Sequence, residues 1–181
     1  MNLKSIQRLP KVELHAHLNG CIPLNLLQKL AKERNVDLSN KHFDHKQNDE
    51  KGMYNRRPRT LNDCFELFAE LPKFINDLAA LREVTVTALT EFAEHHVVYL
   101  ELRSTPTRLL FHHRDNPTLA SKRDYVDTIL RILENFNRTE QERYEQDHPA
   151  SRLPLVSRLI VSVDRSQSLD EAAENVDLAI A

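Results

Sequence analysis

Two histidines one residue apart, His15 and His17, have the type and spacing that best suit chemistry in this sequence. They lie in an apolar run that predicts a strand, and residues two apart on a strand share a face. Both imidazoles are therefore expected to project together. The opposite, apolar face is expected to carry Leu14, Ala16 and Leu18. Imidazole binds zinc at about 2.0–2.1 Å, so the pair suits half of a tetrahedral zinc site. The alternative is a pair of half-exposed histidines on an edge strand.

Strand and helix patterns alternate along the chain, which is typical of βα units around a parallel sheet. Strands are predicted at Val12–Leu18, Val97–Thr105 and Arg158–Asp164, and covering helices at Leu24–Arg34 and Asp77–His95. The histidine pair falls at the carboxyl end of the first strand. Barrel enzymes place their active-site groups at that end of their strands.

Three further helix starts carry a hydroxyl residue followed three positions later by an acid, which is the capping-box pattern. These are Thr60 with Asp63, Ser121 with Asp124, and Ser168 with Glu171. The polar segment 39–59 predicts a long loop, and loops of this length are often lids. We expect residues 1–181 to form one domain that stops after about three βα units, because a closed eight-stranded barrel takes about 250 residues.

Composition excludes several classes of protein. The 181 residues include only two glycines, so neither a P-loop nor a dinucleotide-binding turn is present. The 25 basic and 27 acidic residues are scattered along the chain and give a net charge of −2. This distribution does not indicate a basic surface that binds nucleic acid. The two cysteines do not suggest a disulfide framework. Without a membrane-length apolar run or a secretory signal, we expect a cytoplasmic protein that does not bind membranes.

Three segments resemble the adenosine/AMP deaminase family. Leu9–Gly20 is similar to the opening strand of that family, Leu100–Arg108 to its second strand and Val161–Arg165 to its third. Asn19 stands where classical adenosine deaminases carry an aspartate. This asparagine and the Arg-Ser-Thr-Pro-x-Arg ending of the second segment resemble the corresponding residues of the deaminase-like branch, which acts on N6-methyl-AMP.

The resemblance implies an α/β fold, the N-terminal part of a zinc-dependent TIM (β/α)8 barrel that is incomplete in this chain. In that family, zinc-bound hydroxide attacks C6 of a purine, and ammonia or an alkylamine departs. The resemblance implies that His15 and His17 are two of the zinc ligands. The family's other ligands, its proton-shuttling glutamate and its water-activating histidine lie on later strands, so no catalytic acid or base is assigned in this chain.

Five residues near the predicted strand ends are candidates for substrate binding: Asn19, Thr105, Thr107, Arg108 and Asp164. Hydroxyl groups beside a guanidinium suit a phosphate, which arginine can bind with two hydrogen bonds. The alternative is an ordinary turn around a proline. Asn19 suits a sugar or base edge, or simply an Asn-Gly turn. Asp164 suits substrate orientation, or an ion pair with the arginine that follows it.

The function predicted from these features is hydrolytic deamination at C6 of a purine nucleoside or nucleoside monophosphate, with N6-methyl-AMP favoured and this chain alone inactive. The expected partner is the small-molecule purine, and the oligomeric state is not predicted. One alternative is another metal-dependent amidohydrolase, because the His-x-His strand recurs among enzymes with many substrates. The other is a non-catalytic, truncated fragment that binds partners through exposed sheet edges.

Overall fold

The structure of the chain is a computed structural model. It describes residues 6–37, 60–111, 118–146 and 152–181. The segment 39–59, predicted to be a long loop or lid, lies outside these residues. None of the helices in the described residues has the length and apolar composition needed to span a membrane.

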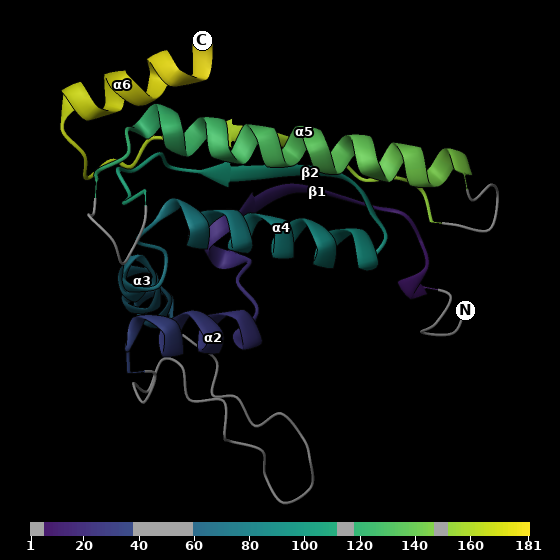
Figure 1. Ribbon diagram of the computed structural model, residues 1–181, viewed down its shortest axis with the longest axis horizontal. Helices are drawn as coiled ribbons and strands as arrows, with labels where there is room; N and C mark the ends of the chain where they lie inside the picture. The colour runs from purple at the N-terminus through teal and green to yellow at the C-terminus, as the bar shows by residue number, and fades with distance from the viewer. Residues whose placement is uncertain (1–5, 38–59, 112–117, 147–151) are drawn as a thin grey trace, which may run out of the picture.

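The described residues form a three-stranded parallel sheet in the order β1-β2-β3, which does not close into a barrel (Figure 1). Strand β1 (Lys11–His17) pairs with β2 (Val97–Ser104), and β2 pairs with β3 (Val156–Val161). Three predicted strands are therefore confirmed, but their boundaries differ. Leu18 lies in the 3-10 turn η1 (Leu18–Gly20) rather than in β1.

The predicted strand Arg158–Asp164 is wrong at both ends, because β3 begins at Val156 and ends at Val161. Asp164 instead begins a turn. Its Oδ1 accepts hydrogen bonds from the backbone N–H and the hydroxyl of Ser166, both at 2.8 Å. Aspartate commonly makes such local bonds, and they compete with the ladder of a sheet. Asp164 therefore lies beyond the strand end, in the loop that follows it.

The helices flank the strands in the alternation that the sequence predicts. They are α2 (Leu24–Arg34), α3 (Leu61–Glu70), α4 (Leu78–Glu94), α5 (Lys122–Gln146) and α6 (Leu169–Ile180), with a short 3-10 helix η2 (Leu71–Lys73) between α3 and α4. The capping box predicted at Ser168 and Glu171 is formed. Asp77 is the N-cap of α4 rather than its first residue, because its carboxylate accepts the backbone N–H of Ala80 at 2.7 Å.

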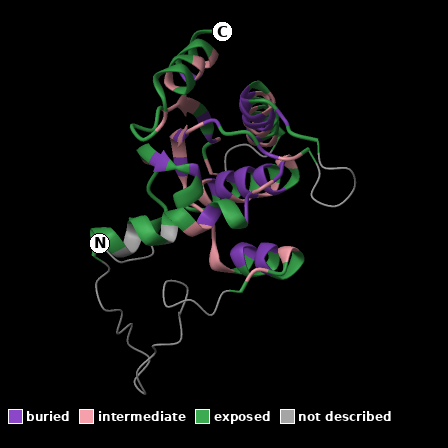
Figure 2. Ribbon diagram, turned by 90° about the vertical axis from the view of Figure 1, so that its left-hand side faces the viewer, coloured by how far each residue is buried: buried purple, intermediate pink, exposed green. Residues whose placement is uncertain are grey.

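The core lies between the sheet and helices α4 and α5, which pack against each other (Figure 1). Leu100 and Leu102 of β2 are fully buried on the helix side of the sheet, whereas the alternating Glu101 and Arg103 are partly exposed. Figure 2 shows the buried residues gathered in α4 and along one side of α5, while α6 is largely exposed. The polar face of the strands is thus left free for a site.

The apolar face predicted for β1 is covered only in part. Ala16 and Leu18 are buried, as expected, but Leu14 is 53% exposed. Strand β1 is an edge of the described sheet, so no described strand lies beyond it. The alternation along a strand fixes the side to which a residue points, whereas burial depends on what lies against that side.

Candidate functional site

The two histidines of β1 converge at its carboxyl end. Their Nε2 atoms lie 3.1 Å apart, and their ring centroids are 5.1 Å apart. The carboxylate of Glu13 accepts a hydrogen bond from the backbone N–H of His15 at 2.8 Å. This bond restrains the backbone between Glu13 and His15. The two imidazoles therefore lie on the same side of the strand, as the alternation predicts.

This spacing fits a shared metal ion. Two nitrogens bound to zinc at about 2.0–2.1 Å in tetrahedral geometry lie about 3.3–3.4 Å apart, close to the 3.1 Å between the Nε2 atoms of His15 and His17. Within the described parts of the chain, no group of three or more His, Cys, Asp or Glu residues is arranged to hold a metal ion. The donor set therefore suits part of a zinc site.

The surroundings of His17 favour the form of its imidazole that binds metals. The pKa of His17 is lowered, first by burial, then by the neighbouring His15 and then by Arg103. Arg103 is the partner of His17 in the register between β1 and β2. A lowered pKa keeps more of the imidazole neutral near pH 7, and the neutral imidazole is the form that coordinates a metal.

A cavity of about 370 Å³ opens at the carboxyl ends of the three strands. Its wall contains all five residues that the sequence predicts for substrate binding, namely Asn19, Thr105, Thr107, Arg108 and Asp164. Seven further residues complete the lining: Pro72, Ile75, Asn76, Pro106, Leu109, Tyr125 and Gln167. His15 and His17 are not among the lining residues, but they lie at the carboxyl end of β1, with only Leu18 between His17 and Asn19.

The topology explains why residues so far apart in sequence meet. Asn19 lies in η1, directly after β1, whereas Thr105, Thr107 and Arg108 follow the end of β2. Asp164 follows β3. Because all three strands are parallel, their carboxyl ends lie on one edge of the sheet, where ligands bind in open α/β folds. The Thr105 and Ser162 hydroxyls hydrogen-bond at 3.0 Å and join the second and third of these segments.

Opposite charges meet at this cavity. The pKa of Asp164 is lowered by hydrogen bonds from Ser166, first from its backbone N–H and then from its hydroxyl, so the carboxylate is ionised near neutral pH. Arg108 lies 3.6 Å from Glu174 of α6, and its side chain is 53% exposed. The cavity therefore offers a cation to an anionic group of a ligand and a carboxylate to a hydroxyl or N–H group.

Three polar lining residues were not predicted from the sequence. Asn76 precedes α4, Tyr125 lies on α5, and Gln167 follows β3. Tyr125 has the spacing of a core residue and is buried, with its hydroxyl 2.7 Å from that of Ser104. Only Gln167 carried a usable signal, because it lies in the same strand-end loop as Asp164.

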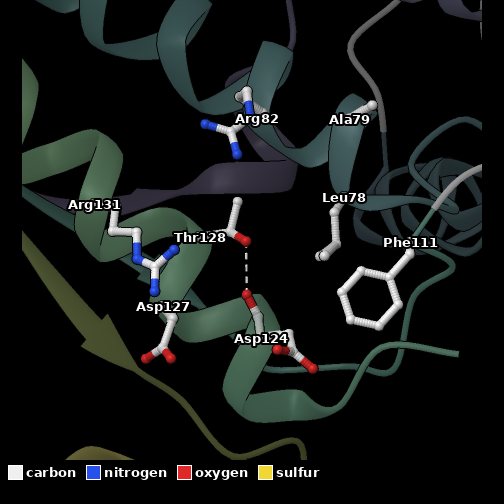
Figure 3. Close-up of a pocket in the computed structure, with 8 residues that line it drawn as sticks. All are labelled: Leu78, Ala79, Arg82, Phe111, Asp124, Asp127, Thr128 and Arg131. Atoms are coloured by element: carbon white, nitrogen blue, oxygen red, sulfur yellow. Dashed lines mark hydrogen bonds between the residues drawn. The ribbon is translucent and has the colours of Figure 1, made fainter.

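A second cavity, of about 330 Å³, lies between α4 and α5 and contains none of the predicted site residues (Figure 3). Arg82 and Arg131 line it together with Asp124 and Asp127. The two basic and two acidic side chains give this cavity no net formal charge. The strand-end cavity, lined by Arg108 and Asp164, is neutral as well, so formal charge does not separate the two; the strand-end cavity is the better candidate because ligands of parallel α/β sheets bind at the carboxyl ends of the strands.

Comparisons with known proteins concern the family and the fold of the chain. The family model described as "Adenosine deaminase" matches residues 10–179. The human protein "N6-Methyl-AMP deaminase" is 36% identical over 171 residues, which are 94% of this chain and 41% of that protein. The crystal structure of Arabidopsis N6-mAMP deaminase has a TM-score of 0.67 at 31% identity, covering 98% of this chain and 48% of that one.

A further Arabidopsis structure, "ADAL complexed with IMP", has a TM-score of 0.67 at 31% identity, over 98% of this chain and 47% of that one. This chain spans less than half the length of the curated relatives that it matches. The match nevertheless runs over nearly all of its 181 residues, through the histidine pair and the strand ends that line the cavity. The chain therefore belongs to the adenosine deaminase family.

Proposed function

We propose that this chain is the N-terminal part of an enzyme that hydrolyses the C6 amino or alkylamino group of a purine nucleoside monophosphate, with N6-methyl-AMP as the favoured substrate. The observation that carries the proposal is the meeting of five polar residues around one cavity, beside the histidine pair. The human relative named N6-Methyl-AMP deaminase and the Arabidopsis relative complexed with IMP support this choice of ligand.

Each cavity residue has a chemical role in the proposal. Arg108 binds the phosphate with charge-assisted hydrogen bonds, and the Thr105 and Thr107 hydroxyls donate further bonds to it. Asp164, as an ionised carboxylate, accepts a hydrogen bond from a ribose hydroxyl or a ring N–H. Asn19 can both donate and accept, which suits the sugar or the edge of the base. These contacts would orient the purine toward the histidine pair.

His15 and His17 would hold a zinc ion as two of its ligands, in keeping with the 3.1 Å between their Nε2 atoms. Zinc, when bound, would supply an activated water for attack at C6. The described residues provide no cluster that completes the ligand set. We therefore propose that the 181-residue chain binds the nucleotide but does not turn it over by itself. A cytoplasmic location also remains a prediction.

The test compares the binding of IMP and inosine, which differ by the phosphate group. Isothermal titration calorimetry on the purified chain should show tighter binding of IMP than of inosine. Arg108→Ala should weaken IMP binding by about 10- to 100-fold, because a hydrogen bond to a charged group contributes about 1.5–3 kcal/mol. Inosine binding should change little.

The matched control is Arg131→Ala, which removes the same charge from the second cavity and should leave both affinities unchanged. Equal losses of IMP and inosine in Arg108→Ala would remove Arg108 from the phosphate site. If the wild-type chain bound neither compound, the proposal would fail, and the alternative of a non-catalytic fragment would be favoured.

A further inference from the structure

We propose that Glu174 of α6 is a positioning residue that holds Arg108 at the cavity and so sets the preference for a phosphorylated ligand. This inference rests on the proposed function, in which Arg108 binds the phosphate. Glu174 does not line the cavity itself. It contacts Arg108, with its Oε1 3.6 Å from the guanidinium Nη2.

Glu174 is anchored by a buried cation. The side chain of Lys122, at the start of α5, is only 3% exposed, and its Nζ lies 3.2 Å from Glu174 Oε2. The same ammonium donates to Asn175 Oδ1 at 3.0 Å and to the backbone carbonyl of Glu171 at 3.2 Å. Three partners on one helix therefore fix Lys122 against α6, and Lys122 fixes one oxygen of the Glu174 carboxylate.

This anchor is continuous with the cavity wall. Asn175 is fully buried, and its Nδ2 donates to Gln167 Oε1 at 3.1 Å and to the backbone carbonyl of Ser162 at 3.4 Å. Gln167 lines the cavity, and Ser162 contacts Thr105, which also lines it. Helix α6 is thus joined to the same strand-end loops that carry the proposed phosphate-binding residues.

Arg108 needs such support because its own segment gives it little. It follows the end of β2 in an irregular stretch, and half of its side chain is exposed. A free arginine loses rotamer entropy when it closes on a phosphate, and a carboxylate that already restrains it reduces that loss. At 3.6 Å, the contact with Glu174 restrains the guanidinium while leaving donors free for a ligand.

The charge of Glu174 does not cancel the attraction for phosphate. Lys122, Glu174 and Arg108 together carry a formal charge of +1, because Lys122 neutralises the carboxylate from beneath. The exposed end of this group is the arginine. The arrangement therefore holds a positive group at the cavity without a second uncompensated charge in the interior.

Two variants test the positioning role in the full chain. Glu174→Gln removes the charge. Glu174→Asp keeps the charge beside buried Lys122, and so protects the fold, but shortens its reach toward Arg108. Both should lower the ratio of IMP affinity to inosine affinity by about two- to five-fold, the factor that a partly exposed ion pair supplies. Asp177→Asn, an exposed acid on the same helix with no described contact to Lys122 or Arg108, should leave the ratio unchanged.

Nuclear magnetic resonance of the Arg108 Nε–Hε group provides a readout independent of nucleotide, and this signal should show greater mobility in both Glu174 variants. An unchanged or larger affinity ratio in folded Glu174→Asp overturns the inference while leaving the proposed function intact. A wild-type chain that does not prefer IMP over inosine overturns the proposed function, and the inference with it. Circular dichroism establishes that each variant is folded.

Discussion

Replacing buried Glu140 by glutamine should destabilise the chain more than removing the charge of an exposed acidic residue of α5. Glu140 is 6% exposed and accepts hydrogen bonds from two arginines. Arg152 contacts both carboxylate oxygens, with Nη2 3.0 Å from Oε1, and Arg143 Nη2 lies 3.3 Å from Oε2. The backbone N–H of Leu155 also points to this carboxylate, at 3.5 Å. The cluster joins α5 to the segment that leads into β3.

The magnitude follows from the burial of the three side chains. Breaking a fully buried ion pair costs about 3–5 kcal/mol, because it leaves an uncompensated charge in the interior. Here the Glu140 side chain is 8% exposed, but the Arg143 and Arg152 side chains are 29% and 22% exposed and keep part of their hydration. We therefore expect a loss of about 2–3 kcal/mol. For a chain of this length, that lowers the Tm by about 5–10 °C.

Urea denaturation followed by circular dichroism measures this loss directly. The matched control is Glu142→Gln, two residues along the same helix. Glu142 pairs with Arg138 at 3.5 Å, and their side chains are 52% and 66% exposed. An exposed pair at i,i+4 on a helix contributes about 0.3–0.5 kcal/mol, so the control should change the free energy of unfolding by no more than about 0.5 kcal/mol. Equal losses in the two variants would refute the role assigned to the Glu140 cluster.

The pH dependence provides a second check of the same cluster. Burial alone would raise the pKa of Glu140, but hydrogen bonds from Arg152 and Arg143 outweigh it, and the pKa is lowered. A carboxyl group whose pKa is lower in the folded state stabilises the fold above its unfolded-state pKa of about 4.3. This stability is lost as the pH falls through the folded-state pKa. The difference between the wild type and Glu140→Gln should therefore be constant above about pH 5 and shrink below it. A difference that stayed constant to pH 3 would contradict this linkage.

Two further predictions concern the histidine pair. The chain should bind zinc weakly, because catalytic and structural zinc sites use at least three protein ligands; tight stoichiometric zinc that is lost in His17→Ala, measured by atomic absorption, would contradict this. The chain with added zinc should not deaminate AMP, N6-methyl-AMP or adenosine in an assay of purine absorbance, because the described residues lack a complete ligand cluster. Turnover abolished by His15→Ala would show that other groups complete the site.

The parts of the fold that local patterns determine were predictable from the sequence. Helix α2 has the bounds that its apolar spacing indicates, Leu24–Arg34, and the capping box at Ser168 is formed. The shared side of His15 and His17 follows from the alternation of a strand. The meeting of the cavity residues needed one more step, the parallel order of the strands, which the alternation of strands and helices also indicates.

Features that depend on contacts between elements were not predictable in the same way. β3 ends at Val161, opposite Ser104, where its partner β2 also ends, and Asp164 lies in the turn that follows, bonded to Ser166. Leu14 is exposed because β1 is an edge of the described sheet. Asn76 and Tyr125 reach the cavity from elements whose packing no local spacing specifies. Each of these outcomes was decided by a neighbour distant in sequence.

Lys122 shows how a local conflict can point to such a distant contact. It is the first residue of α5, where the helix dipole disfavours a cation, and its side chain is nevertheless almost fully buried. A buried ammonium is tolerated only when it is paired and hydrogen-bonded, so this residue required acceptors from elsewhere. Helix α6 supplies them through Glu174, Asn175 and the carbonyl of Glu171. The unfavourable start of one helix is thus explained by the acceptors of another, and the same contact places Glu174 beside the arginine of the cavity.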